Sequence, residues 1–260
     1  MSLQAFSERF IRSLDIELES VAHKYPYPHG SAQEIRQSLN AYREVLNQNR
    51  DKIKALHDSH CSGVVVCSLL SELIDRFIIH ITNILNFSEK KQDGFAVIAL
   101  GGYGRSELNP FSDIDLLFLL EENAESLYQN EITTMIQFLW DINLHIGHST
   151  RTAVECIEAA NDDTYLATSL LEARYLTGSE TIWIEFKDFY NNWLRKDAGN
   201  NLAMQKIEER NKRLESYHRT VQIQIPNVKE SPGGLRDIHF ARWLMMMIGQ
   251  GNNLRDLNNS

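Results

Sequence analysis

The chain has 260 residues, enough for one large domain or two small ones. Its 43% of hydrophobic and 23% of charged residues are ordinary for a globular protein. The formal net charge of −9 argues against a general nucleic-acid-binding protein, because such proteins normally carry a basic excess.

Membrane and secretory features are missing from the sequence. No apolar run is long enough to span a membrane, and the first residues lack the apolar core of a signal peptide. The cysteines, Cys61, Cys67 and Cys156, are odd in number and lack the spacing of metal ligands. We therefore expect reduced thiols in a cytoplasmic protein that has no membrane partner.

Residues 1–90 predict an N-terminal helical region. Two prolines and Gly30 break the chain, and Ser31 then stands where an N-cap is needed. A helix follows, with apolar residues at helical spacing, namely Ile35, Leu39, Tyr42, Val45 and Leu46. A second helix, over about residues 64–87, has an apolar stripe wide enough for burial on two sides. Because no chemistry is evident, we interpret this region as a support for a sheet.

Residues 95–104 predict a buried strand followed by a glycine-rich turn. The short apolar run at 95–100 is typical of a buried strand. Gly101, Gly102 and Gly104 then lie within four residues, and glycines let backbone N–H groups approach a ligand closely. A glycine cluster alone usually makes only a tight turn. Where a helical turn opens just after such a loop, the N–H groups can hold an anion.

The next apolar run, at 114–120, predicts a second strand and is joined to two carboxylates, Asp113 and Asp115. Residues two apart in a strand point to the same face, so both should project together near the glycine turn. Two close carboxylates repel each other unless a cation lies between them. Mg²⁺ prefers one or two carboxylates together with phosphate oxygens of a substrate. Although most such pairs are solvated turns, this combination favours metal-assisted nucleotidyl transfer, with Mg²⁺ or Mn²⁺ held by Asp113 and Asp115.

A helix and a third strand are predicted to follow. The helix has apolar residues at clear amphipathic spacing, namely Ile132, Met135, Ile136, Leu139 and Trp140. Residues 144–152 predict the strand, which contains His145 and His148. Their odd spacing places these two side chains on opposite faces of a strand, so a joint metal site is not expected.

From about residue 153 onward the sequence predicts helices again. The first contains Tyr165 and Leu176 and is closed by Gly178. The second has an aromatic stripe that we interpret as core, and a charged third helix covers 202–218. We expect this C-terminal helical region to continue beyond residue 260, because its last helix has no convincing stop signal.

Residues 226–238 are a second chemically distinctive stretch. A Pro-Gly-Gly turn precedes a helix that opens at Leu235, and Arg236 offers a bidentate fork to a phosphate or a carboxylate. Glu230 and Asp237 would either pair with an arginine, as a buried brace between the helical region and the sheet, or bind a metal. The sequence leaves both alternatives open.

Three stretches carry a resemblance to a known family. They are GGYGRSELNPFSDIDLL at 101–117, GHSTRT at 147–152 and PNVKESPGGLRDI at 226–238. In this order they resemble the motifs of the bacterial PII uridylyltransferase/uridylyl-removing enzymes, in their N-terminal nucleotidyltransferase region. Ser231 departs from the pattern, which commonly has glycine there. In that family, a phosphohydrolase domain and paired sensing domains follow the helical region.

The resemblance implies an α+β fold, in which a small mixed sheet with helices, of nucleotidyltransferase type, is flanked by N- and C-terminal helical regions. We predict the regions as 1–90, 91–155 for the nucleotidyltransferase domain, and 156–260. The implied activity is transfer of UMP from UTP to a tyrosine of a PII-like signalling protein in nitrogen regulation. The implied nucleotide-binding residues are Gly101, Gly102, Gly104, Arg105, Ser112, Arg151 and Arg236.

Two alternative functions remain open at this point. The first is an adenylyl- or guanylyltransferase that acts on another acceptor, because the glycine turn and carboxylates would be the same. The second is a catalytically weak, nucleotide-binding regulatory module. Nucleotidyltransferases of this broad fold often carry a third carboxylate on a later strand, whereas the candidate strand here offers Ser149, Thr150, Arg151 and Thr152. The third metal ligand is therefore unknown.

Overall fold

The computed structural model describes residues 3–85, 94–217 and 227–247. Phe87, His218 and Pro226, which stand at the ends of three predicted segments, lie outside the described residues. The chain divides into two compact units. The first consists of Met1–Thr152 with Glu172–Ile184, and the second of Ala153–Leu171 with Glu185–Ser260.

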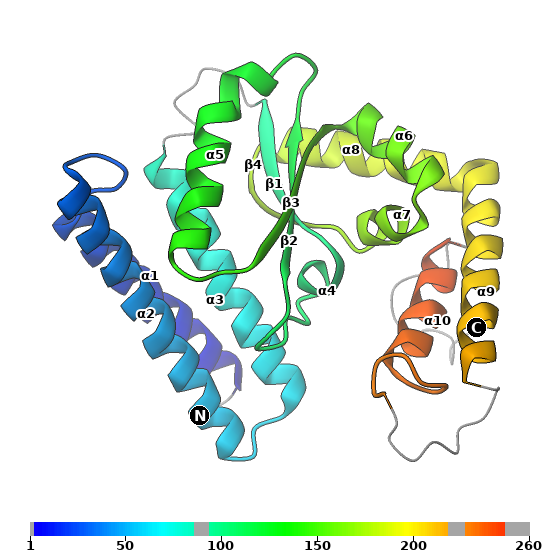
Figure 1. Cartoon of the computed structure of the whole chain (residues 1–260), viewed down its shortest axis with the longest axis horizontal. Coiled ribbons are helices and arrows are strands. Elements are labelled where there is room, and N and C mark those ends of the chain that lie inside the picture. Colours follow the sequence, from blue (N-terminus) through cyan, green and yellow to red (C-terminus); the bar gives the residue numbers. More distant parts are fainter. Residues whose placement is uncertain (1–2, 86–93, 218–226, 248–260) are drawn as a thin grey trace. The chain divides into compact units, whose positions relative to one another are not determined.

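Three long helices form the N-terminal part of the first unit (Figure 1). They are α1 (Leu3–Lys24), α2 (Ala32–Asp58) and α3 (Gly63–Ile84). Ser31 is the N-cap of α2, as the sequence predicts: its Oγ accepts from the Glu34 N–H at 3.3 Å. The Glu34 carboxylate in turn accepts from the Ser31 N–H at 2.7 Å, which completes a capping box.

The sheet of the first unit has four strands in the order β3-β2-β1-β4. Their bounds are β1 (Phe95–Ala99), β2 (Ile114–Leu120), β3 (Ile146–Thr152) and β4 (Arg174–Gly178). Strand β1 pairs antiparallel with β2 and β4, while β2 and β3 are parallel. The single turn α4 (Gly101–Gly104) follows β1, and α5 (Glu125–Asp141) joins β2 to β3. A small mixed sheet with helices confirms the predicted α+β fold class.

The central strands are buried on both faces. On one face, Val97, Leu116 and Phe118 join a core that contains Phe77 of α3 and Phe138 of α5. The alternate residues Ile98, Leu117 and Leu119 are also buried, at 0% exposure. A strand covered on both sides needs a continuous apolar run, which explains why β2 is so uniformly hydrophobic after its second residue.

Strand β4 corrects one prediction from the sequence. The helix that was expected to contain Tyr165 and Leu176 is shorter: α7 (Thr164–Leu171) ends before Glu172, and residues 174–178 pair with β1. Gly178 closes this strand at a φ of +104°, and a Cβ there would lie 2.5 Å from the Phe95 carbonyl oxygen. Pairing with a distant strand thus overrides the helical spacing of the local sequence.

The second unit is built from helices. Its elements are α6 (Ala153–Asp162), α7, the later part of α8 (Glu180–Trp193), a π-helical segment (Leu194–Ala198), α9 (Gly199–Ser216) and α10 (Leu235–Met247). Phe186 and Tyr190 of α8 are fully buried, and the Tyr190 hydroxyl donates to the Ala167 carbonyl at 2.5 Å. The aromatic stripe is therefore core at these positions. No helix within 3–85, 94–217 and 227–247 is both long and apolar enough to cross a membrane.

Candidate functional site

The glycine turn is fastened to the start of β2. The Leu100 N–H donates to the Asp115 carbonyl at 3.0 Å, just where β1 ends. The Gly104 and Arg105 N–H groups donate back to the carbonyls of Leu100 and Gly101 at 2.9 and 3.1 Å, which closes the single turn α4. Gly101 has a φ of +55°, a conformation that favours glycine. The turn is thus held directly beside the acidic end of β2.

The glycines of this turn differ in the space around them. A Cβ on Gly104 would lie 2.4 Å from the Glu172 carbonyl oxygen, so this position requires glycine for packing. Among the described residues beyond its chain neighbours, a Cβ on Gly101 would come within 4 Å of the Asp115 Oδ2 alone, at 3.6 Å. A Cβ on Gly102 would likewise meet the Arg105 Nη2 at 3.6 Å. Gly101 and Gly102 therefore leave their backbone open to an approaching group, on the side where Asp115 lies.

Asp113 and Asp115 come together in one pocket of the first unit, as the sequence predicts. Asp113 immediately precedes β2, Asp115 is its second residue, and both are exposed. They line a cavity of about 650 Å³ whose other walls are Trp140, Asn143, Leu144, His145, Ile146 and Gly147. The apolar strand that follows Asp115 fixes where the pair lies.

Gly147 is a residue of this pocket whose role the sequence did not reveal. It stands opposite Asp115 in the parallel pairing of β2 with β3. A Cβ on Gly147 would lie 2.6 Å from the Asp115 Oδ1, closer than real Cβ atoms come. The glycine of the GHSTRT stretch therefore makes room for the Asp115 carboxylate.

The electrostatics of the pair favour a cation. Although the Asp115 side chain reaches solvent, partial burial raises its pKa, and the negative charge of Asp113 raises it further. A cation between the two carboxylates would oppose both effects. Within 3–85, 94–217 and 227–247, no group of three or more histidine, cysteine or acidic side chains could hold a metal. Two carboxylates fit Mg²⁺ when substrate phosphates complete its ligands.

The structure places the other predicted site residues of the first unit in different surroundings. Arg105 donates to Glu107 at 2.7 Å and to Glu172 at 2.6 Å, and its side chain is only 10% exposed.

Ser112 is exposed next to Asp113. Arg151 pairs with Leu119, four residues along β3 from Gly147, which corresponds to about 13 Å at 3.3 Å per residue. Ser112 is therefore a direct neighbour of the Asp pair, Arg105 is paired with two glutamates, and Arg151 lies further along β3.

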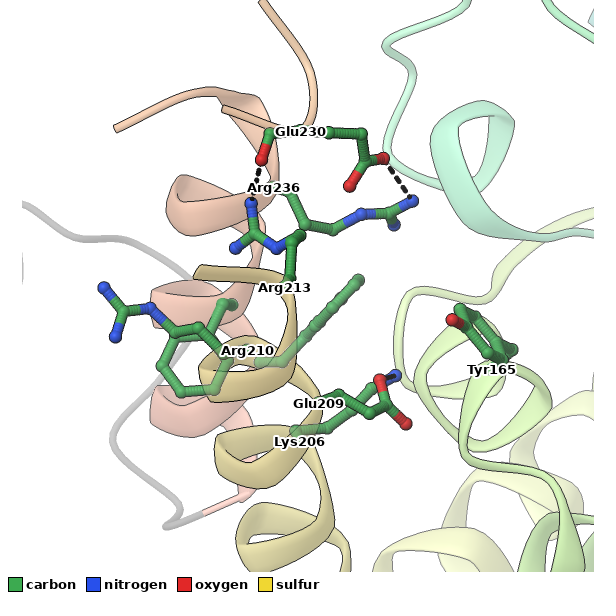
Figure 2. Close-up of a pocket in the computed structure, with 9 residues that line it drawn as sticks. Tyr165, Lys206, Glu209, Arg210, Arg213, Glu230 and Arg236 are labelled. Atoms are coloured by element: carbon green, nitrogen blue, oxygen red, sulfur yellow. Dashed lines mark hydrogen bonds and ion pairs between the residues drawn. The ribbon is translucent and has the colours of Figure 1, made fainter. Parts of the chain in front are cut away.

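Arg236 belongs to the second unit, where it lines a pocket of about 320 Å³ (Figure 2). The walls of this pocket are Tyr165, Lys206, Glu209, Arg210, Arg213, Glu230, Arg236, Phe240 and Trp243. The Arg236 Nη2 donates to the Glu230 Oε1 at 3.2 Å, and Figure 2 shows this ion pair at one side of the pocket. Glu230 is thus bound to an arginine.

Asp237 is also part of a brace. Its carboxylate accepts from Arg210 at 3.0 Å, from Arg213 at 2.6 Å and from the Gly233 N–H at 2.7 Å. Partial burial alone would raise the pKa of Asp237, but these hydrogen bonds outweigh it and lower the pKa. Pairing with arginines is therefore found in the structure. Arg210, Arg213 and Arg236 all belong to the second unit, so the brace lies within that unit and not between the helical region and the sheet.

We expect Asp237→Ala to destabilise the protein by about 2 to 3 kcal/mol, because it leaves two arginine charges partly buried without their partner. This stabilisation requires an ionised carboxylate. It should be present above the unfolded pKa of about 4 and be lost as pH falls through the lowered folded pKa. Chemical denaturation at pH 7 and pH 3 measures both effects. Glu208→Ala, which breaks an exposed pair with Lys212, is the control and should change little.

Comparison with known proteins agrees with this geometry. The model of the GlnD PII-uridylyltransferase family matches residues 202–260, and that of glutamate-ammonia ligase adenylyltransferase matches residues 59–153. The bifunctional uridylyltransferase/uridylyl-removing enzyme of Nitrosococcus oceani is 37% identical over 204 residues, 78% of this chain and 22% of the relative. That of Ralstonia nicotianae is 36% identical over 215 residues, 83% of this chain and 24% of the relative.

The chain belongs to the family of the bifunctional uridylyltransferase/uridylyl-removing enzymes. The resemblance of the three motifs is thereby confirmed across most of the sequence. The chain spans less than a quarter of the length of the Nitrosococcus and Ralstonia enzymes. Within this span lie the Asp pair, the glycine turn and the brace around Asp237.

Proposed function

We propose that this chain is a metal-dependent nucleotidyltransferase that moves UMP from UTP to a tyrosine hydroxyl of a PII-like signalling protein. The observation that carries the proposal is the shared pocket of Asp113 and Asp115 beside the open backbone of Gly101 and Gly102. The base and the acceptor come from the names of the relatives. In this proposal the enzyme acts in the cytoplasm and takes part in nitrogen regulation.

Asp113 and Asp115 would hold the Mg²⁺ or Mn²⁺ ion. When bound there, the metal supplies positive charge to the phosphate oxygens of UTP and to the attacking and leaving oxygens. The carboxylates themselves orient this charge, because the start of β2 and the room left by Gly147 fix the position of Asp115. A raised pKa of Asp115 also means that metal binding competes with a proton at low pH.

The protein groups around the metal would bind the nucleotide. The open turn at Gly101 and Gly102 offers its backbone to the phosphates. Ser112, exposed next to Asp113, adds a hydroxyl donor. Arg151, in the same unit, would contact the nucleotide elsewhere, and Arg105 and Gly104 would support the turn through their contacts with Glu172.

A nucleotide panel tests this proposal. The chain would be incubated with a PII-like protein, Mg²⁺ and UTP, ATP, GTP or CTP, each labelled at the α-phosphate. We expect label on the PII-like protein from UTP, and no label once a chelator removes the metal. Equal labelling from all four nucleotides would contradict the proposed choice of base.

An adenylyltransferase is the second candidate function. It is favoured by the match of residues 59–153, which include the glycine turn and both aspartates, to the glutamate-ammonia ligase adenylyltransferase model. Label transferred from ATP in the same panel, with glutamine synthetase as acceptor, would select it over uridylyl transfer. Tight binding of UTP without any labelled product would instead indicate a nucleotide-binding regulatory module.

A further inference from the structure

A network of three side chains, two of them buried, lies against the glycine turn in the first unit. Arg174 of β4 forms a two-pronged ion pair with Asp75 of α3, with N–O distances of 2.7 and 3.1 Å. The Tyr103 hydroxyl, within the turn itself, donates to the same carboxylate at 2.6 Å. Tyr103 is 1% exposed and Asp75 is 8% exposed, so water does not substitute for these bonds.

Arg174 also bonds to the backbone of the turn. Its Nε donates to the Gly104 carbonyl at 3.3 Å, and its Nη2 donates to the Tyr103 carbonyl at 3.2 Å. The guanidinium carbon lies 5.4 Å from the centre of the Tyr103 ring, within the range of a cation–π interaction. One guanidinium therefore joins α3, β4 and the carbonyl end of α4.

Arg174 bonds to the last two residues of the turn, Tyr103 and Gly104, and not to its accessible first two residues. Gly104 packs against the Glu172 backbone, whereas Gly101 and Gly102 leave their backbone accessible beside Asp115. The N–H groups of Arg105, Ser106 and Glu107 donate to the carbonyls of Gly101, Tyr103 and Gly102 at 3.1, 3.0 and 2.9 Å, so the following backbone closes most of the turn. Arg174 adds a second donor to the Tyr103 carbonyl and a donor to the Gly104 carbonyl, and it ties this end of the turn to the buried carboxylate of Asp75.

We propose that Arg174, through Asp75 and Tyr103, is a positioning residue that fixes the glycine turn in the geometry needed to bind the phosphates of the nucleotide. This inference rests on the proposed function, since it deepens the account of the same site. Only arginine has planar donors in sufficient number to contact the carboxylate and both carbonyls at once. Lysine would keep the charge and lose this geometry.

A second ion pair of the first unit provides a matched control. Arg76 of α3, the neighbour of Asp75 in sequence, forms a two-pronged pair with Asp15 of α1 at 2.6 and 2.8 Å. Its side chain is 30% exposed, close to the 29% of Arg174. Among the described residues, Arg76 makes no hydrogen bond or ion pair with the turn. The Asp15 side chain is 32% exposed and that of Asp75 only 11%, so disturbing the Arg174 pair should cost more stability, but only Arg174 should affect the turn.

The test compares Arg174→Lys and Tyr103→Phe with Arg76→Lys in the full chain. Hydrogen exchange of residues 100–107 without ligand reports the turn directly, and steady-state kinetics at saturating acceptor report KM for UTP and kcat. We expect Arg174→Lys to speed exchange of the turn at least about tenfold and to lower kcat/KM for UTP at least about tenfold, mainly through KM. Tyr103→Phe should give smaller changes of the same sign.

Arg76→Lys should leave both quantities within about twofold of the wild type at a temperature where all variants are folded. The inference is overturned when Arg174→Lys and Arg76→Lys give the same exchange and kinetics, because Arg174 is then an ordinary stabilising pair. A wild-type chain that does not use UTP refutes the proposed function, and the exchange measurement still decides whether Arg174 holds the turn. Faster exchange with unchanged kinetics would also overturn the proposed effect on the nucleotide.

Discussion

Changing Asp113→Asn together with Asp115→Asn is expected to abolish metal-dependent turnover while the fold survives. Both carboxylates line one pocket, and Asn cannot supply the negative charge that holds a divalent cation. Loss of the metal removes several kcal/mol of transition-state stabilisation, so kcat/KM should fall at least about a thousandfold. Turnover of UTP with a PII-like acceptor, measured beside circular dichroism, checks this expectation.

The same double variant should melt at a higher temperature than the wild type without metal. Burial and the charge of Asp113 raise the folded pKa of Asp115, so its ionised form costs stability. This cost appears as pH rises above the unfolded pKa of about 4 and is complete above the raised folded pKa. Because Asn carries no charge, the gain in melting temperature should be present at pH 7 and absent near pH 3.

Metal binding gives a further distinction between the two proteins. Millimolar Mg²⁺ should raise the melting temperature of the wild type and leave that of the double variant unchanged, because a ligand stabilises only the state that binds it. Glu121→Gln with Glu122→Gln, which removes two exposed charges just beyond the other end of β2, is the matched control. Normal turnover in the aspartate double variant would refute the metal assignment.

Gly102→Val is expected to weaken nucleotide binding while the fold survives, whereas Gly104→Val is expected to destabilise the fold. A side chain at Gly102 meets only the Arg105 Nη2 at 3.6 Å, so the folded state should tolerate valine. Affinity for UTP should nevertheless fall at least about tenfold, because a branched side chain blocks approach of phosphate to the backbone. Isothermal calorimetry with UTP and Mg²⁺ measures this loss, and Gly102→Ala should show a smaller one.

At Gly104 the first atom of any side chain would lie 2.4 Å from the Glu172 carbonyl oxygen. Such overpacking against backbone should cost about 3 kcal/mol or more, seen as a lower midpoint in denaturant. The two substitutions therefore separate a glycine kept for ligand approach from one kept for packing. Unchanged UTP affinity in Gly102→Val would mean that the backbone of the glycine turn does not bind the nucleotide.

The sequence was most informative where structure is local. The apolar run of β1, the glycines of α4 and the carboxylates at the start of β2 follow one another directly, so spacing alone placed them together. The capping box at Ser31 was equally visible, because its partner Glu34 is three residues away. These features depend on neighbours in the chain.

Features that depend on distant neighbours could not be predicted. Strand β4 exists because it pairs with β1, about 80 residues earlier, and its own spacing resembled a helix. The pairing of Arg105 with Glu172, 67 residues further along, is likewise invisible in the sequence. Gly147 and Arg174 matter through contacts with Asp115 and Asp75, and no local pattern marks such contacts.

The most direct test of the central claim is the mass of the acceptor after reaction. A PII-like protein would be incubated with the chain, UTP and Mg²⁺ and then analysed by intact-mass spectrometry and peptide mapping. We expect one UMP to be added to a tyrosine of the acceptor, and the addition to be lost on chelation and with the aspartate double variant. An acceptor that stays unmodified while the chain binds UTP and Mg²⁺, or one that the double variant modifies equally well, would contradict this expectation.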